Sequence, residues 1–296
     1  MGQVVTSNLA LRGALLGLAA MAVYAANDNI IKFLGGGYNP FQIMFFSGLA
    51  AVPLVMIQMV LDREAGSFRP RLPGWMAIRC AVALVNAIFV VYAFGKLPLA
   101  QCYAIFFTMP LMVTLLAAWW LKESISTGRG IAVIVGFIGV LIALQPGQQP
   151  LQWAHLAAVI GSIASAFNFV ILRRTATVER NAVNIIYPML SQLLVAGMVL
   201  PFVYVPMQIS DIGLTWAMAA CGVGGSIMII AAYRVAPAII VAPMQYSQII
   251  WAALTGAFIF NEQVTPATWA GLAVIIGAGL YILTSARTRH AAAVKS

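Results

Sequence analysis

Apolar runs of about 20 residues recur along the whole length of this 296-residue chain. Each run is long enough to cross the hydrocarbon of a bilayer as a helix, and a chain inside lipid must satisfy its backbone hydrogen bonds internally. Only 8% of the residues are charged and the mean hydropathy is +0.97, whereas a soluble domain has about 25% charged residues. We therefore predict an all-α integral membrane protein.

Helix-breaking stretches between the runs predict ten transmembrane helices. Glycine, proline and asparagine gather at 35–40, at 145–150 and at Pro206. The expected spans are 10–34, 39–61, 73–94, 98–120, 128–144, 151–172, 181–205, 211–234, 238–260 and 265–285. The three cysteines lie inside apolar runs without CxxC spacing, so we expect no disulfide, no metal site and no cofactor.

The second half of the chain repeats the first. When the halves are aligned, the matching positions include Pro98 and Pro237, Glu123 and Glu262, Asn27 and Asn168, Lys32 and Arg173, and the runs 130–136 and 271–277. The halves 1–146 and 147–296 then hold five spans each, and because five is odd, the second half enters the membrane inverted. We predict two inverted five-helix repeats around a central cavity, an arrangement common in secondary transporters. A duplication that only enlarged a helical bundle is the alternative.

The basic residues predict the orientation of the chain. Of the 16 Lys and Arg residues, only Lys32 and Lys96 fall on one side of the predicted spans, and the others fall on the opposite side. Both termini are therefore expected in the cytoplasm of a bacterial cell, with the spans in its inner membrane. This distribution accounts for the net charge of +9, so we expect the lipid bilayer and not nucleic acid as a partner.

In these features the chain resembles the drug/metabolite transporter (DMT) superfamily, in its ten-helix EamA-type family. The resemblance covers essentially the whole chain, and its features are the twofold repeat, the turns Lys122-Glu123 and Asn261-Glu262, and the glycine-bearing runs 130–139 and 271–279. It implies a basket of helices around a central cavity, peripheral fifth and tenth spans, and export of small metabolites. Within the family the chain looks most like the exporters of aromatic and other neutral amino acids. A glycine-lined peripheral helix would also allow a homodimer.

Polar side chains within the spans are candidates for substrate binding, because they are costly in lipid. Asp28 either meets a substrate ammonium or carries a proton, or it forms an ion pair with Lys32 one turn away. Asn27 and its repeat mate Asn168 either bind the polar head of a substrate or form a hydrogen bond between helices. Tyr24 either caps a substrate or belongs to the interfacial aromatic belt.

The ninth predicted span contains the strongest polar signal. Gln245 and Gln248 are three residues apart and share a helix face. This face must line a cavity or meet a partner helix, because two amides in lipid would lack hydrogen bonds. The fourth span has Phe106 and Thr108 in the matching stretch, so one half offers polar contacts and the other mainly apolar ones. The predicted substrate-binding residues are Tyr24, Asn27, Asp28, Asn86, Phe89, Phe106, Thr108, Ser165, Asn168, Gln245, Gln248 and Trp251, and the predicted hinges are Pro98, Pro110, Pro237 and Pro243.

Other function classes lack their motifs. The chain has no HExxH, no His/Cys cluster, no G-x-S-x-G and no P-loop, so we expect neither an enzyme nor an ATP-driven pump. Arg79 stands alone near a cytoplasmic end, which argues against a carrier of phosphate esters, since these need clustered cations. We therefore predict a secondary transporter that exports neutral, aromatic or hydrophobic amino acids and related metabolites by alternating access. A multidrug exporter of the same fold, a passive channel and a membrane scaffold are the alternatives.

Overall fold

The computed structural model describes residues 7–62, 68–120, 127–145, 151–175, 178–236 and 238–293, and these residues are almost entirely helical. The elements are α1 (Ser7–Gly35), α2 (Pro40–Asp62), α3 (Pro73–Lys96), α4 (Leu99–Phe106), α5 (Met109–Trp120), α6 (Thr127–Leu144), α7 (Trp153–Thr175), α8 (Asn181–Val203), α9 (Ile209–Val235), α10 (Ala238–Val241), η1 (Ala242–Tyr246), α11 (Ser247–Phe260) and α12 (Pro266–Ala293). Within the described ranges six helices, α1, α2, α3, α7, α8 and α9, are long and apolar enough to cross a membrane. The helical architecture expected from the apolar runs is confirmed.

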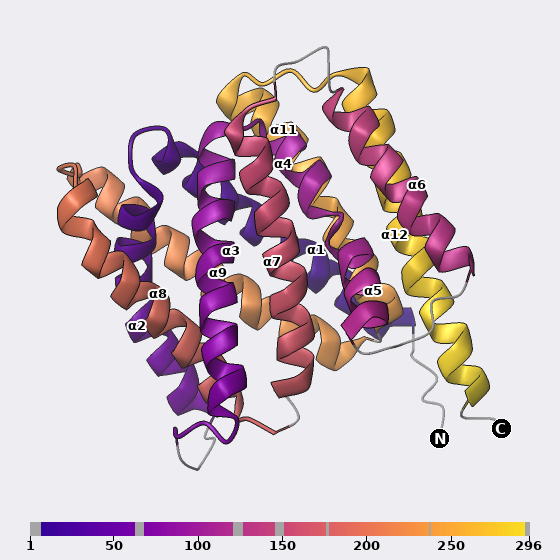
Figure 1. Cartoon of the computed structure of the whole chain (residues 1–296), viewed down its shortest axis with the longest axis horizontal. Helices are drawn as coiled ribbons and strands as arrows, with labels where there is room; N and C mark the ends of the chain where they lie inside the picture. Colours follow the sequence, from indigo (N-terminus) through magenta and orange to yellow (C-terminus); the bar gives the residue numbers. More distant parts are fainter. Residues whose placement is uncertain are drawn as a thin grey trace.

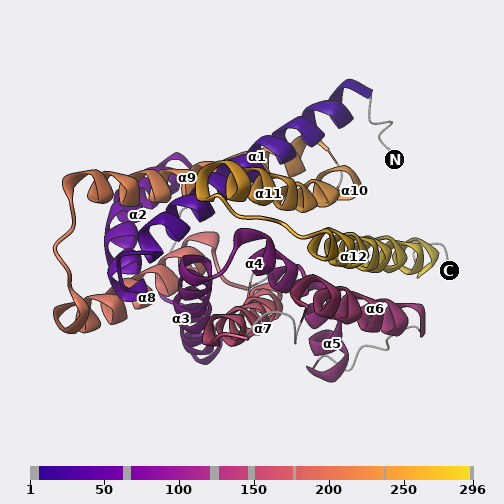
Figure 2. The ribbon, with the colours of Figure 1, turned by 90° about the horizontal axis from the view of Figure 1, so that it is seen from above.

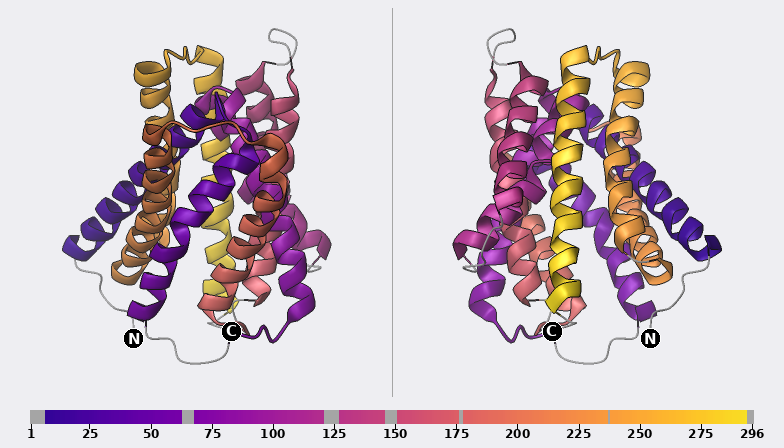
Figure 3. Two further views of the ribbon diagram at one scale, coloured as in Figure 1. Left: turned by 90° about the vertical axis from the view of Figure 1, so that its left-hand side faces the viewer. Right: turned by 90° about the vertical axis from the view of Figure 1, so that its right-hand side faces the viewer.

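The helices form two layers with a helix pair at each edge (Figures 1 and 2). One layer holds α3 packed on α7, followed by α4 and α5, and the other holds α1 packed on α9, followed by α10 and α11. At one edge α2 packs on α8, and at the opposite edge α6 packs on α12. We call the end at which α2 ends and α3 begins the lower end, as drawn in Figure 1, and the opposite end the upper end. Helix α1 begins and α12 ends toward the lower end (Figure 3).

The fourth and ninth predicted spans are not continuous helices, in contrast to the expectation from sequence. The fourth is interrupted between α4 and α5, and the ninth is interrupted by η1, which contains Pro243. Proline lacks the N–H that an α-helix needs and crowds the preceding turn. At each interruption a hydroxyl donates to the carbonyl three residues earlier: Thr108 to Ile105 at 2.6 Å and Ser247 to Met244 at 2.6 Å.

The apolar core is concentrated in the upper half of the bundle. Its main cluster joins the upper parts of α1, α2 and α3 to α4, α7, α11 and α12, and includes Leu34, Ile43 and Leu97. On the outside of the bundle large apolar side chains such as Phe202 and Phe258 are 86% and 83% exposed, as expected where helices face lipid.

The edge pair α6 and α12 packs through glycine. A β-carbon added at Gly271 would lie 2.7 Å from the β-carbon of Ala143, and one added at Gly139 would lie 3.0 Å from the carbonyl oxygen of Gly271. The first distance is shorter than real side chains allow and the second is tighter than most side-chain contacts, so glycine permits this close approach of the two helices. The pair stands at the side of the bundle and does not touch the central cavity described below.

Candidate functional site

A cavity of about 570 Å³ lies among α1, α2, α3, α7, α8 and α9, and we call it the central cavity. It reaches from Asn27 on α1 down to Gln58, which lies four residues before the end of α2. Helices α2 and α8 converge at the upper end and diverge toward the lower end (Figure 3, left). The volume falls in the range of about 300–1,000 Å³ that is typical of small-molecule sites.

The lining of the central cavity is mainly apolar, with a small number of polar groups. Besides Ala, Val, Ile, Leu and Met, the polar and charged side chains that line it are Asn27, Ser47, Gln58, Arg79, Asn168, Asn184, Gln192 and Ser226. The repeat mates Asn27 and Asn168 thus meet at one cavity. The Oδ1 atom of Asn168 is buried and has no hydrogen-bond partner. A buried polar atom without a partner is uncommon, so this oxygen is available to a bound solute.

Arg79 lies in the wall of the central cavity near its lower end and is 8% exposed. Its Nη1 atom donates to Oδ1 of Asn184 at 2.5 Å, and the hydroxyl of Thr175 donates to the same oxygen at 2.9 Å. Arg79 is not among the site residues predicted from the sequence. Its spacing could have placed it there, because Arg79, Ala83 and Ala87 follow one another at four-residue steps, and such residues share a helix face.

The upper end of the cavity is closed by an ion pair between Lys32 and Glu262. The Lys32 ammonium lies 2.6 Å from the Glu262 carboxylate, and it also donates to the carbonyl of Leu97 at 2.6 Å. The second carboxylate oxygen of Glu262 accepts from the backbone N–H of Leu99 at 2.9 Å. This cluster joins α1, the loop after α11 and the α3–α4 connection. The pairing of Lys32 with Asp28, one of the two interpretations of Asp28, is therefore not what the structure contains.

The turn that places Glu262 is set by its neighbours. Asn261 ends α11 in the left-handed region, with φ 53°, which asparagine tolerates better than most residues. The N–H of Glu262 then donates to the carbonyl of Gly256 at 2.8 Å, a common helix C-terminal motif. A β-carbon at Gly256 would lie 2.8 Å from the Glu262 carboxylate. Glycine at this position therefore lets the carboxylate fold back toward α1.

Two further contacts tie the upper ends of the helices together. Gln42, which is fully buried, donates to the carbonyl of Val205 at 2.6 Å and accepts from its N–H at 3.0 Å. Tyr38 donates to the carboxylate of Asp211 at 2.6 Å, and this hydrogen bond raises the pKa of the Tyr38 hydroxyl above its usual value of 10.0. Gln42, near the start of α2, is thereby linked to the α8–α9 connection, and Tyr38, in the loop before α2, is linked to the first turn of α9. The central cavity is thus sealed at its upper end.

The predicted residues on α1 gather near the upper end of the central cavity. The hydroxyl of Tyr103 donates to the carboxylate of Asp28, and the amide of Asn27 donates to the same carboxylate at 3.2 Å. Tyr24 and Ser226 share a hydrogen bond of 3.1 Å between α1 and α9. Asp28 therefore lies directly behind a residue of the cavity wall, with hydroxyl and amide donors as its partners.

Several predicted residues contact other helices. The Asn86 amide donates to the hydroxyl of Ser165 at 2.5 Å, which joins α3 to α7. Thr108 is buried and shares a hydrogen bond of 3.0 Å with Ser162. The Phe106 ring belongs to the periphery of the core and packs against α3. Asn86 and Ser165 thus form a contact between helices and are not part of the lining of the central cavity.

The remaining predicted residues do not line the central cavity. Gln245 is exposed on η1, whereas Gln248, Trp251 and Phe89 are half-buried. The Nε1 atom of Trp251 is buried without a hydrogen-bond partner. Residues three apart share a face in a 3₁₀ segment as well as in an α-helix, but neither glutamine is part of the lining of the central cavity. Their assignment to substrate binding stays a prediction.

The predicted hinge prolines lie at helix boundaries or interruptions. Pro98 caps the start of α4, Pro110 is the second residue of α5, and Pro243 lies in η1. Pro237 lies outside the described residues, as does the Lys122-Glu123 turn on which part of the resemblance depends.

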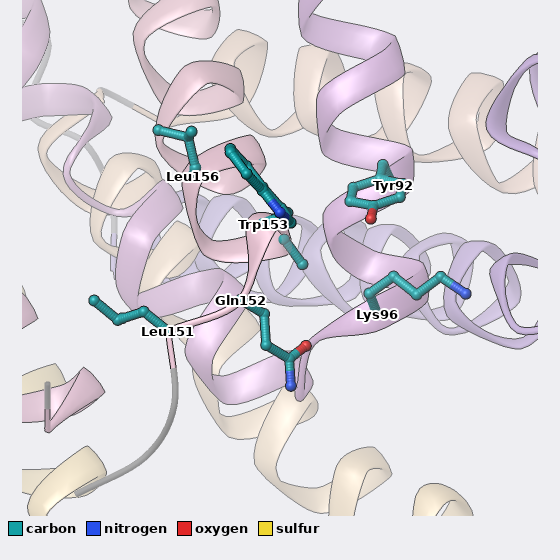
Figure 4. A pocket seen from close by; sticks show the side chains of 7 residues that line it. Tyr92, Lys96, Leu151, Gln152, Trp153 and Leu156 are labelled. Atoms are coloured by element: carbon teal, nitrogen blue, oxygen red, sulfur yellow. The ribbon is translucent and has the colours of Figure 1, made fainter. Parts of the chain in front are cut away.

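A second hollow of about 650 Å³ lies on the surface at the upper ends of α3 and α7 (Figure 4). It is lined by Tyr92, Lys96, Leu151, Gln152, Trp153, Ala154 and Leu156. Trp153 is 80% exposed and Lys96 is also exposed, as is usual for residues at a membrane–water interface. Because its walls are mainly exposed side chains, we take the central cavity, whose polar side chains are buried or half-buried, as the candidate site.

A bundle of membrane-length helices around a solute-sized, partly polar cavity defines the class of membrane transporters. The comparisons with known proteins agree with this class. Residues 11–145 match the EamA-like transporter family. Over these residues the chain is similar to this family, which is part of the DMT superfamily, and the chain is a multi-pass membrane protein.

Relatives with named substrates cover nearly the whole chain. The S-adenosylmethionine uptake transporter of Rickettsia bellii is 24% identical over 276 residues, which cover 90% of this chain and 92% of that protein. The riboflavin transporter of Brucella anthropi is 25% identical over 280 residues, which cover 90% and 96%. One crystal structure has a TM-score of 0.63 at 16% identity and covers 95% of this chain and 98% of its own. This last likeness concerns the fold alone.

Proposed function

We propose that this chain is a secondary transporter that carries a neutral or zwitterionic small metabolite across the bacterial inner membrane by alternating access. The observation that carries the proposal is the central cavity of about 570 Å³, which reaches the lower end of the bundle and is sealed at the upper end. A solute bound beside Asn27 and Asn168 would have access to one side of the membrane only. That is one of the two states that alternating access requires.

The cavity lining supports two inverted halves, 1–146 and 147–296. The alignment that sets Pro98 on Pro237 maps four lining positions of α3 onto four lining positions of α9: Arg79 onto Met218, Ala83 onto Gly222, Ala87 onto Ser226 and Val91 onto Ile230. The alignment that sets Asn27 on Asn168 does the same for α2 and α8: Met44 onto Ile185, Ser47 onto Pro188, Gly48 onto Met189 and Ala51 onto Gln192. Halves related by an axis through the cavity would produce this correspondence, whereas an enlarged bundle without symmetry would not require it.

Helix packing gives the same support. The contact of α1 with α9 corresponds to the contact of α7 with α3, and α2, α4 and α6 pack against their own mates α8, α11 and α12. The rings of Phe107 and its mate Tyr246 contact each other with centroids 5.2 Å apart. In this scheme the interruptions beside these two rings, near Pro110 and Pro243, are the bending points of the two halves.

The substrate that we propose is a metabolite of nucleoside or vitamin size. The relatives with named substrates carry S-adenosylmethionine and riboflavin, and the cavity volume suits solutes of that size. These names give no support to aromatic amino acids or to export, so both stay predictions from the sequence. If the termini are cytoplasmic, as the basic residues predict, then the state described here is open to the cytoplasm.

The test is counterflow in liposomes that contain the purified protein. The panel consists of labelled S-adenosylmethionine, riboflavin, phenylalanine and threonine, each with and without a pH gradient. Saturable counterflow of one solute, weakened when Asn27 and Asn168 are both replaced by leucine, supports the proposal. Flux that rises linearly with concentration, together with single-channel conductance, would instead identify a passive channel.

A further inference from the structure

Arg79 is a buried cation at the one end of the central cavity that is not sealed. The side chain is 8% exposed and belongs to the cavity wall near the lower end of α3. Its Nε atom is buried and has no hydrogen-bond partner, and its Nη1 atom donates to the neutral amide of Asn184. A guanidinium has five N–H donors, so most of its capacity is available to a ligand.

No carboxylate of the described residues pairs with Arg79. The carboxylate of Glu262 pairs with Lys32 at the opposite end of the cavity. The nearby carboxylate of Glu179 accepts instead from the backbone N–H of Leu72 at 2.6 Å. Burying an unpaired charge is costly, and such a charge inside a membrane protein usually has a function.

The internal repeat has no charge at the position that corresponds to Arg79. Arg79 corresponds to Met218 in the alignment that sets Pro98 on Pro237, and both side chains line the central cavity. The other half therefore builds the symmetry-related part of the wall, near the upper end of α9, with an uncharged side chain. The positive charge of Arg79 is an addition to the scaffold and not part of it.

We propose that Arg79 binds a carboxylate of the transported solute, which makes that solute a carboxylate-bearing metabolite. This inference rests on the transport function proposed above. Arginine matches the planar geometry of a carboxylate with two parallel hydrogen bonds. Arg79 is the only Lys or Arg among the residues that line the cavity in the described part of the chain. A single cation balances one negative charge, whereas a phosphate ester would need more than one.

The dimensions of the cavity define where the rest of the solute lies. Helices α1 and α3 meet at Gly35 and Gly95, so Asn27 and Ala87, each eight residues earlier, lie at about the same level. Arg79 is a further eight residues toward the lower end of α3, which corresponds to about 12 Å along the helix. A solute of nucleoside size can therefore contact Arg79 with its carboxylate and Asn27 with a polar group at its other end.

The experiment compares solutes with and without the carboxylate in proteoliposomes. The pairs are S-adenosylmethionine with its decarboxylated form and phenylalanine with phenylalaninamide, and riboflavin serves as a solute without a carboxylate. The variants are Arg79→Met, which copies the repeat mate, and Arg79→Lys, which keeps the charge but cannot form the two parallel hydrogen bonds of a guanidinium. Arg71→Met, at an exposed arginine in the loop before α3, is the matched control.

We expect Arg79→Met to raise KM for the carboxylate solute about 10- to 100-fold, with a smaller rise for Arg79→Lys and none for Arg71→Met. The analogue without a carboxylate should have the same KM in the wild type and in Arg79→Met, which also shows that the variant is folded. An equal rise in KM for both members of a pair would overturn the inference. Transport of riboflavin, and of none of the solutes with a carboxylate, by the wild type would also overturn it. In both cases transport itself stands, whereas a wild type that carries none of the solutes contradicts the proposed function.

Discussion

The ion pair of Lys32 with Glu262 should hold the upper end of the cavity closed. The two side chains are 12% and 13% exposed and their charged groups lie 2.6 Å apart. Removing one partner of a buried pair costs about 3–5 kcal/mol, and partial exposure reduces this to about 2–3 kcal/mol. If this energy favours the closed upper end, Glu262→Gln should increase the population of the upper-open state about 30- to 150-fold.

The backbone contacts of this pair make the prediction more specific. Lys32 donates to the carbonyl of Leu97, and Glu262 accepts from the N–H of Leu99. An exchange of the two charges would therefore place a carboxylate at a carbonyl and an ammonium at an N–H. We expect the exchanged variant to be no better closed than the single variants. The neutral double variant Lys32→Met with Glu262→Gln should be better closed than either single variant, because it leaves no charge without a partner.

Cysteine accessibility measures the closure. A cysteine placed at Ser47, in the cavity wall, is reacted with a membrane-impermeant maleimide from the upper side, in a chain without its three native cysteines. Glu262→Gln should accelerate this reaction, and Lys96→Met, which removes an exposed cation at the same end, should not. Equal rates in Glu262→Gln and the parent, or additive effects of the two single variants in a double-mutant cycle, would refute the reasoning.

Two further predictions concern stability. Gly271→Ala should destabilise the purified protein by about 1–3 kcal/mol, because the new methyl group would lie 2.7 Å from the β-carbon of Ala143. The control Gly277→Ala, which has open space around it, should not lower Tm. Equal melting temperatures of Gly271→Ala and the wild type would contradict the packing of α6 on α12. Tyr38→Phe should lower Tm at pH 8, since the Tyr38 hydroxyl donates to Asp211 and its pKa is raised above 10.0. A raised pKa stabilises the folded state at pH values below the pKa of the unfolded chain, and this stabilisation is lost as the pH rises through the pKa of the folded chain. The difference in Tm between the wild type and Tyr38→Phe should therefore shrink above pH 10. A difference in Tm that grows above pH 10 would contradict this.

The helices and the meeting of Asn27 with Asn168 could be predicted from the sequence, because both follow from local pattern and internal repetition. Apolar runs fix helices in lipid, and symmetry-related positions must come together if the halves enclose one site. The ion-pair partner of a charged residue is harder to predict. Lys32 is one turn from Asp28, and the four-residue spacing favours their pairing. Its actual partner, Glu262, is distant in sequence and is placed by a helix C-terminal turn.

The glutamines of the ninth span show a second limit. Gln245 and Gln248 are spaced to share a face in an α-helix and in a 3₁₀ helix, yet Gln245, which lies in the 3₁₀ segment that contains Pro243, is exposed, whereas Gln248 is half-buried. Proline was recognised as a helix breaker, but its consequence for side-chain direction depends on packing that no short pattern contains. Arg79 was missed for the opposite reason, since an isolated charge near a span end resembles an orientation signal until its neighbours are known to line a cavity.

The repeat also predicts which wall of the cavity becomes accessible when the upper end opens. Val55 lines the lower part of the central cavity, and in the alignment that sets Asn27 on Asn168 it corresponds to Ala196 on α8, which is fully buried. In a state where the two halves exchange conformations, Ala196 should line the cavity and Val55, which is 7% exposed here, should no longer line it. A cysteine at Ala196 should therefore react from the upper side in Glu262→Gln and not in the parent, while a cysteine at Val55 should react more slowly from the lower side in the same variant. If both cysteines instead react faster in Glu262→Gln, the variant has loosened the bundle, and the two-state exchange inferred from the repeat is wrong.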